Sequence, residues 1–191
     1  PMCVDVVMFF PSGPAGTSRK FNVLFCGNLT RRKGADLLND IAARLDSKIM
    51  IHVAYSRDAN KYIRDAGNIN MLGKVHAQGM SELYNNMDLL LMPTVREGMS
   101  MTVLEAMSSG LPVVGSDCSS MPELVVQERG GFLCPIGDVE QFAKKINLLR
   151  GDAALVKEMG EYNRARIEGD YQLKIMVAAY RGLFHEVLSG L

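Results

Sequence analysis

Short apolar runs alternate with helical patterns along most of this chain. The runs are continuously apolar rather than alternating with polar residues, which is typical of parallel strands buried on both faces. The predicted strands are Asn22–Cys26, Lys48–Ala54, Ile69–Leu72, Asp88–Met92, Pro112–Val114 and Gly131–Cys134. Alternation of strands with helices predicts an α/β fold, in which helices cover both faces of a parallel sheet of about six strands.

Helical periodicity fills the intervals between these runs and continues beyond the last of them. The predicted helices are Gly34–Leu45, Ala59–Asp65, Met80–Asn86, Thr102–Ser109, Pro122–Gln127, Val139–Leu149, Ala153–Glu168 and Gln172–Leu188. Residues 1–20 form a lead-in that contains the Pro/Gly/Ser-rich stretch Pro11–Ser18. We therefore expect one domain over residues 21–191, closed by two extra C-terminal helices.

Ligands of open parallel sheets bind beyond the carboxyl ends of the strands. Three loops lie at such ends: Gly27–Lys33, the turn after Leu72, and Pro93–Met101. We expect the binding site in these loops.

Composition narrows the classes of function. The 191 residues are 48% hydrophobic, and Lys+Arg and Asp+Glu balance at 21 each. This neutrality gives no support for a nucleic-acid partner, and no apolar run reaches the roughly 18 residues of a membrane span. The four cysteines form no CxxC pair and the three histidines are isolated, so we expect reduced structural thiols, no metal site and a cytoplasmic location.

The loop from Gly27 to Gly34 joins the first strand to the first long helix. Gly27 lets the backbone approach a ligand closely, and Lys33 brings a cation to a helix N-terminus that already favours anions. Together they suit a diphosphate, although an ordinary basic loop in water would have the same composition. The loop does not match G-x-G-x-x-G, which argues against a nicotinamide or flavin dinucleotide site.

Glu97 and Glu105 flank the predicted start of the helix that follows the fourth strand. Were the segment between them wholly helical, they would lie about 12 Å apart along its axis. That is too far for an acid pair that shares one proton, but it suits two ends of one extended ligand, such as a ribose and a sugar. The backbone N–H groups of Met101 and Thr102 would then face a phosphate between them.

A purely structural alternative exists for Glu105. The segment Thr102–Glu105 matches the T-x-x-E capping box, which would account for the glutamate without a ligand. The segment Ser120–Glu123 matches the same pattern with Pro122 in the first turn, and there we expect a helix cap. Glu97 has no such alternative, because it lies in a loop beside Gly98.

At this point the chain resembles the C-terminal, donor-binding domain of GT-B fold glycosyltransferases, in the retaining family 4 group. The segment from Glu97 to Glu105 is similar to the family's E-x7-E element, and G-x-P-V-V follows it. The other matching stretches are Pro1–Pro11, Phe25–Gly34, Leu83–Pro93 and Gly131–Asp138. This resemblance implies a Rossmann-like, doubly wound sheet and a nucleotide-sugar donor of the UDP, GDP or ADP type, with no other cofactor.

The resemblance assigns roles to matching positions. Lys33 would contact the donor diphosphate, Glu97 the donor sugar near its anomeric carbon, and Glu105 the ribose hydroxyls. Both Lys33 and Glu97 would act in catalysis. The backbone of Gly98, Met99, Ser100, Met101 and Thr102 would contact sugar and phosphates, and Lys74 and Val75 would lie against the nucleobase.

The chain also departs from the family pattern. Asn28 stands where the family has the arginine of its phosphate loop, for which Arg31 or Arg32 could substitute, and Ser119-Ser120 replaces a Gly-Gly pair. Only one of the two GT-B domains fits within this length, so we expect the acceptor site, and any membrane association, outside these residues. The predicted function is retaining transfer of a sugar to a hydroxyl acceptor, for example in polysaccharide biosynthesis. The alternatives are an inert nucleotide-sugar-binding module and a GT-B-like sugar-nucleotide epimerase.

Overall fold

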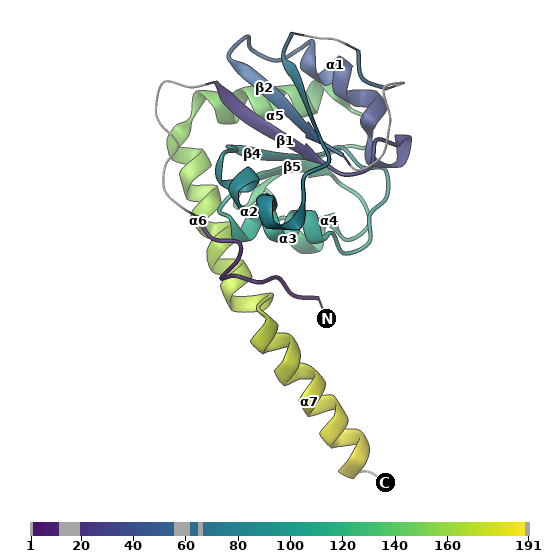
Figure 1. Ribbon diagram of the computed structural model, residues 1–191, viewed down its shortest axis with the longest axis vertical. Coiled ribbons are helices and arrows are strands. Elements are labelled where there is room, and N and C mark those ends of the chain that lie inside the picture. The colour runs from purple at the N-terminus through teal and green to yellow at the C-terminus, as the bar shows by residue number, and fades with distance from the viewer. Residues whose placement is uncertain (1, 12–19, 56–61, 65–66, 190–191) are drawn as a thin grey trace.

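A computed structural model describes residues 2–11, 20–55, 62–64 and 67–189. Its centre is a six-stranded, all-parallel sheet (Figure 1). The strands are β1 (Phe21–Cys26), β2 (Ile49–Ala54), β3 (Ile69–Gly73), β4 (Leu89–Met92), β5 (Val113–Ser116) and β6 (Gly131–Cys134). Their order across the sheet is β3-β2-β1-β4-β5-β6, which is the Rossmann order, so the predicted α/β fold is confirmed.

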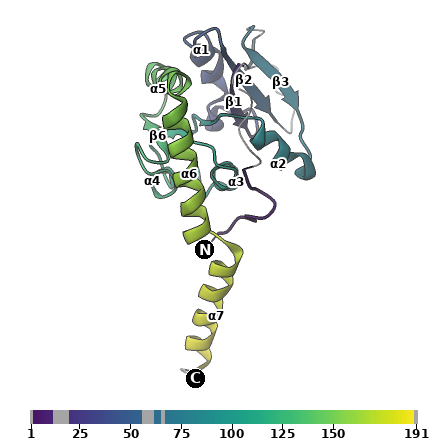
Figure 2. The same cartoon turned by 90° about the vertical axis from the view of Figure 1, so that its left-hand side faces the viewer.

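Helices connect the strands and cover both faces of the sheet (Figures 1 and 2). They are α1 (Leu38–Ala42), α2 (Ala77–Asn85), α3 (Met101–Ser108), α4 (Met121–Leu124), α5 (Val139–Gly151), α6 (Ala153–Asp170) and α7 (Leu173–Ser189), with short 3-10 turns η1 (Arg31–Lys33) and η2 (Ala35–Leu37). No described helix combines the length and apolar character that crossing a bilayer requires.

Alternate residues of each buried strand feed two separate cores. On β4, Leu89 and Leu91 join the core under α1 and α5, whereas Leu90 and Met92 join the core under α2, α3 and α4. The two-residue period of a strand sends successive side chains to opposite faces. The continuous apolar runs in the sequence are therefore the signature of a sheet with a core on each side.

Most of the predicted elements are present within a few residues of their expected limits. Two predicted helices differ. The predicted Pro122–Gln127 ends at Leu124, and most of Ala59–Asp65 lies outside the described residues, with residues 62–64 not helical. The Pro/Gly/Ser-rich stretch also lies outside the described residues, apart from Pro11.

The N-terminal segment 2–11 packs on the core under α2 and α3, where Val4 and Phe9 are buried. Arg164 on α6 holds it there, since its guanidinium donates to the carbonyl oxygens of Phe9 (2.6 Å) and Val6 (3.1 Å). It also donates to the carbonyl of Ser108, the last residue of α3 (2.8 Å). One side chain thus ties the N-terminal segment to α3 and α6.

Arg164→Ala removes these bonds to three backbone carbonyls, of which that of Phe9 keeps another side-chain donor, the Ser108 hydroxyl. We expect the free energy of unfolding to fall by about 2–3 kcal/mol, measured by urea denaturation. Lys157→Ala on the same helix is the matched control, because its ion pair with Glu161 is 3.7 Å long and exposed. We expect that change to stay within about 0.5 kcal/mol of wild type. Equal losses in the two variants would contradict the role given to Arg164.

Candidate functional site

A pocket of about 340 Å³ lies at the carboxyl ends of β1, β2 and β3. It is lined by Cys26, Gly27, Asn28, Lys33, Ala54, Tyr55, Lys74, Val75 and Met80. Five of the residues singled out in the sequence, namely Gly27, Asn28, Lys33, Lys74 and Val75, thus lie around one hollow. It is where a doubly wound sheet is expected to bind its ligand.

The loop after β1 is built by its two glycines and a threonine. Gly27 has a φ of 152°, a conformation that residues with a side chain rarely adopt, and donates its N–H to the carbonyl of Ala54 on β2 (3.0 Å). Thr30 caps the turn η1 by accepting from the Lys33 N–H (3.3 Å). Gly34 then ends the turn in the left-handed conformation at φ 75°. The side chain of Lys33 is thereby directed to the pocket.

The loop after β4 is joined to this first loop. The carbonyl of Arg32 accepts the Val95 N–H (2.9 Å) and the Thr94 hydroxyl (2.9 Å). A side chain at Gly34 would collide with the carbonyl oxygen of Pro93, so the backbones of the two loops approach closely at this point. This contact brings Glu97, 64 residues along the chain, to Lys33.

Lys33 and Glu97 form an ion pair between Nζ and Oε2. Both side chains are largely buried, with 17% and 11% of their surface exposed, so solvent screens this pair less than a surface pair. An ammonium group has three N–H donors. Lys33 can therefore keep its bond to Glu97 and still offer N–H groups to an anion in the pocket.

Glu105 lies on α3 and bonds to α2 rather than to its own helix. Its Oε2 accepts the hydroxyl of the buried Tyr84 (2.9 Å). Burial raises the pKa of Glu105, and the Tyr84 hydrogen bond opposes that rise. Burial also raises the pKa of Cys26 to about 11, with Glu105 adding to the rise and Lys33 lowering it, so both charged groups act on the floor of the pocket.

Neither glutamate takes part in a helix cap, so the capping box predicted at Ser120–Glu123 is wrong and the structural alternative for Glu105 is excluded. Helix α3 begins at Met101 with Ser100 as its N-cap residue, so Thr102 lies inside the first turn and Glu105 has no capping role. Ser120 does occupy the N-cap of α4, but its hydroxyl donates to the carbonyl of Gly98 rather than to the helix. The capping pattern is present in the sequence at both places, but the side chains of Glu105 and Ser120 bond to partners outside their own helices.

Glu97, Glu105 and the predicted residues between them do not line the pocket itself. Gly98 and Met101 are exposed, Ser100 is buried, and Met99 packs against the core under α3. The first backbone N–H groups of α3 have no acceptor within their own helix. Arg31, a suggested substitute for the missing arginine, lies 3.8 Å from Asp36, outside the pocket lining.

Sequence reasoning missed four lining residues: Cys26, Ala54, Tyr55 and Met80. The first three stand at or just beyond the ends of β1 and β2, and that position was the available signal. Among the described residues, no group of three His, Cys, Asp or Glu side chains could hold a metal ion.

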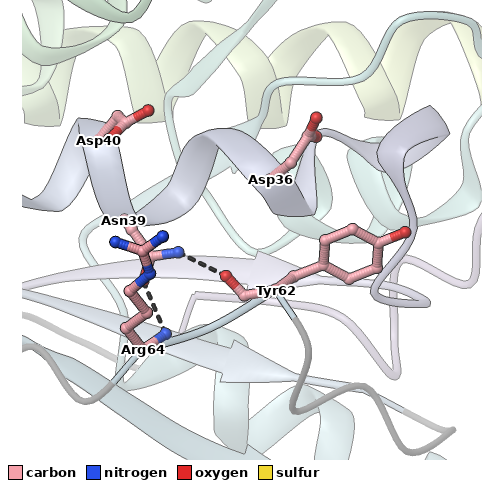
Figure 3. A pocket seen from close by; sticks show the side chains of 5 residues that line it. All are labelled: Asp36, Asn39, Asp40, Tyr62 and Arg64. Carbon is pink, nitrogen blue, oxygen red and sulfur yellow. Dashed lines mark hydrogen bonds between the residues drawn. The ribbon is translucent and has the colours of Figure 1, made fainter.

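A second hollow of about 210 Å³ lies beside α1 (Figure 3). It is lined by Asp36, Asn39, Asp40, Tyr62 and Arg64. Asn39 is engaged by backbone there, since its amide donates to the Tyr62 carbonyl and its Oδ1 accepts the Arg64 N–H (2.8 Å). None of the predicted site residues lines this hollow, so we place the functional site at the first pocket.

Comparison with known proteins gives one family. The family model described as Glycosyl transferases group 1 matches residues 20–152. N-acetyl-alpha-D-glucosaminyl L-malate synthase from Bacillus anthracis is 30% identical over 129 residues, which are 68% of this chain and 33% of that protein.

Solved structures of low sequence identity share the fold. Sucrose-phosphate synthase from Thermosynechococcus elongatus superposes with a TM-score of 0.86 at 19% identity, over 100% of this chain and 52% of that one. HepE from Anabaena, solved in complex with UDP, superposes with a TM-score of 0.83 at 20% identity, over 99% of this chain and 56% of that one. This chain spans a third of the curated relative and about half of these two structures.

Gly34→Ala tests the contact between the two loops. The added methyl group collides with the Pro93 carbonyl at a left-handed position, so we expect a loss of about 2–4 kcal/mol in the free energy of unfolding. Gly169→Ala on α6 is the control, because a methyl group there meets nothing within 4 Å and should be neutral or stabilising by up to about 1 kcal/mol. Wild-type stability in Gly34→Ala would show that the loops are not packed as described.

Proposed function

The chain belongs to the glycosyl transferases group 1 family, and from this premise we propose that it is the donor-binding domain of a retaining glycosyltransferase. It binds a nucleotide-sugar, and the whole enzyme transfers the sugar to a hydroxyl acceptor. The convergence of Lys33, Lys74 and the Gly27 backbone on one pocket is the observation that carries the proposal. An ordinary basic loop exposed to water would not require residues from other loops to form a pocket around it.

In this proposal the pocket divides along the length of the donor. The nucleobase lies against the turn after β3, at Lys74 and Val75, and the ribose hydroxyls donate to Glu105. The diphosphate contacts Lys33 and the N-terminal amides of α3. Glu97 contacts the sugar, which is consistent with its ion pair with Lys33, the residue assigned to the diphosphate.

Stabilisation of the leaving diphosphate is the main catalytic contribution that this domain can make. Negative charge develops on that group as the glycosidic bond to the donor breaks. A preorganised cation and helix-end dipoles stabilise such charge without needing to reorganise. Glu97 holds Lys33 in place before the donor arrives, so the ion pair preorganises the cation.

A second domain completes the site in this proposal and supplies the acceptor. The helix α7 projects from the rest of the domain, and none of its described residues is buried (Figures 1 and 2). Its exposed apolar side chains include Leu183, Phe184 and Leu188. A contiguous apolar face of this kind indicates a protein partner, and we assign it to the other half of the enzyme.

Binding of the donor nucleotide is the first test. We expect UDP, GDP or ADP, or their sugars, to raise the melting temperature, because a ligand that binds only the folded state stabilises it by mass action. Lys33→Ala and Glu105→Ala should each weaken the binding of that nucleoside diphosphate about tenfold or more in calorimetry, because each removes a charged hydrogen-bonding partner.

Two exposed residues provide charge-matched controls. Lys48 lies at the opposite end of the sheet, just before β2, and Glu158 lies on the outer face of α6. Their alanine variants should bind as wild type does. The roles of Lys33 and Glu105 are rejected if their variants keep wild-type affinity, and the proposal itself is rejected if no nucleotide binds.

A transfer assay separates the enzyme from an inert binding module. A protein that joins this chain to its upstream half should transfer sugar from the bound donor with the anomeric configuration of the donor retained in the product, as read by NMR of the new linkage. Nucleotide binding without any transfer would favour the inert module, for which the neutral Asn28 in the pocket is the motivating observation. Inverted product would exclude the retaining mechanism.

A further inference from the structure

Tyr84 has a feature that the proposed function does not use. It lies on α2, is fully buried, and bonds through its hydroxyl to Glu105 on the neighbouring helix. A buried tyrosine needs a partner for its hydroxyl. The hydroxyl of Tyr84 makes only a long contact of 3.5 Å to the backbone carbonyl of Thr102, which by itself could serve as that partner. Instead the hydroxyl meets the carboxylate assigned to the ribose.

We propose that Tyr84 is a positioning residue, which fixes the Glu105 carboxylate for the ribose hydroxyls of the donor. The inference rests on the proposed function and adds to it a residue that does not touch the donor. Its geometric basis is the 2.9 Å bond from the tyrosine hydroxyl to Oε2. Because that bond holds one carboxylate oxygen, it restricts the rotation of the carboxylate.

The tyrosine ring is itself held on its other side. Phe9 packs edge-on against it, with ring centroids 5.8 Å apart and an interplanar angle of 75°. The Phe9 carbonyl in turn accepts the hydroxyl of Ser108 (2.7 Å), three residues beyond Glu105 on α3. The N-terminal segment thus bonds to the helix that carries Glu105 and packs against Tyr84. It therefore fixes both partners of the Tyr84–Glu105 hydrogen bond relative to each other.

The bond also acts on the ionisation of Glu105. A carboxylate accepts from two ribose hydroxyls only when it is ionised. Burial raises the pKa of Glu105 and the Tyr84 hydroxyl opposes this. The pKa of Tyr84 is itself raised by burial and that of Cys26, the other ionisable group acting at this point, is about 11, so both keep their protons between pH 5 and pH 8.

The experiment is UDP binding to Tyr84→Phe by calorimetry from pH 5 to pH 8, with GDP and ADP run beside it. The variant keeps the ring and loses only the hydroxyl. Without that bond the pKa of Glu105 rises, so the loss of affinity on acidification should begin at higher pH than in wild type. Since one pKa unit is a tenfold change, we expect binding about tenfold weaker near the acidic end and only a few-fold weaker at pH 8.

Two controls separate positioning from a general structural effect. Tyr162→Phe removes a hydroxyl from α6, where the ring stacks under Arg129, and should leave the pH profile unchanged. In a Glu105→Gln background, Tyr84→Phe should cause no further pH-dependent loss, because the group through which it acts no longer titrates. A loss equal at every pH and in both backgrounds would overturn the inference.

A measurement without ligand keeps the test independent of the proposed function. The pKa of Glu105, followed by carbon NMR of its carboxyl group, should be higher in Tyr84→Phe than in wild type. An unchanged pKa rejects the positioning role even where UDP binds. Wild-type UDP affinity in Glu105→Gln together with a raised pKa in Tyr84→Phe would reject the ribose assignment and leave the Tyr84–Glu105 coupling in place.

Discussion

The contact between the loop after β1 and the loop after β4 determines the rest of the site. Backbone meets backbone there, with Gly34 against Pro93 and the Arg32 carbonyl accepting from Thr94 and Val95. Such close approach fixes the paths of the two loops relative to each other. The Lys33–Glu97 ion pair follows from it, because the two side chains leave their loops beside that contact.

The sheet order explains why these loops meet. β1 pairs with β2 on one side and with β4 on the other, so the chain reverses its direction of travel across the sheet at this point. Helices leave β1 and β4 toward opposite faces, which opens a crevice at their carboxyl ends. Residues far apart in sequence collect in that crevice, and it is where the predicted site residues Asn28 and Lys33 line the pocket.

The sequence predicted the fold well because burial leaves a simple pattern. The central strands are mostly apolar and have a core on both sides, whereas the edge strand β3 packs on one core only, and a short apolar run is enough to recognise each of them. The pairing of side chains at the site was not predictable in the same way. Lys33 and Glu97 were assigned to different parts of a ligand, yet they bond to each other across 64 residues.

The errors at the helix caps have the same cause. A T-x-x-E or S-x-x-E pattern is a local signal, and it fits where the helix begins only if no stronger partner is near. The Glu105 carboxylate accepts the Tyr84 hydroxyl, and the Ser120 hydroxyl donates to the Gly98 carbonyl. Both partners come from other elements. Cys26 was interpreted as a structural thiol for a similar reason, since only the loops packed around the end of β1 make that position the floor of a pocket.

The charges at the site bear on how the proposed donor is held. Lys33 and Lys74 supply two positive groups on the pocket lining, and Asn28 adds none. Glu97, which pairs with Lys33, and Glu105, which acts on Cys26, supply two negative groups next to the lining without being part of it. A diphosphate therefore meets a site without net positive charge, in which helix-end dipoles must carry part of its stabilisation. Under the proposed function, the remaining stabilisation must come from outside this pocket. That requirement is consistent with the proposal that a second domain completes the site.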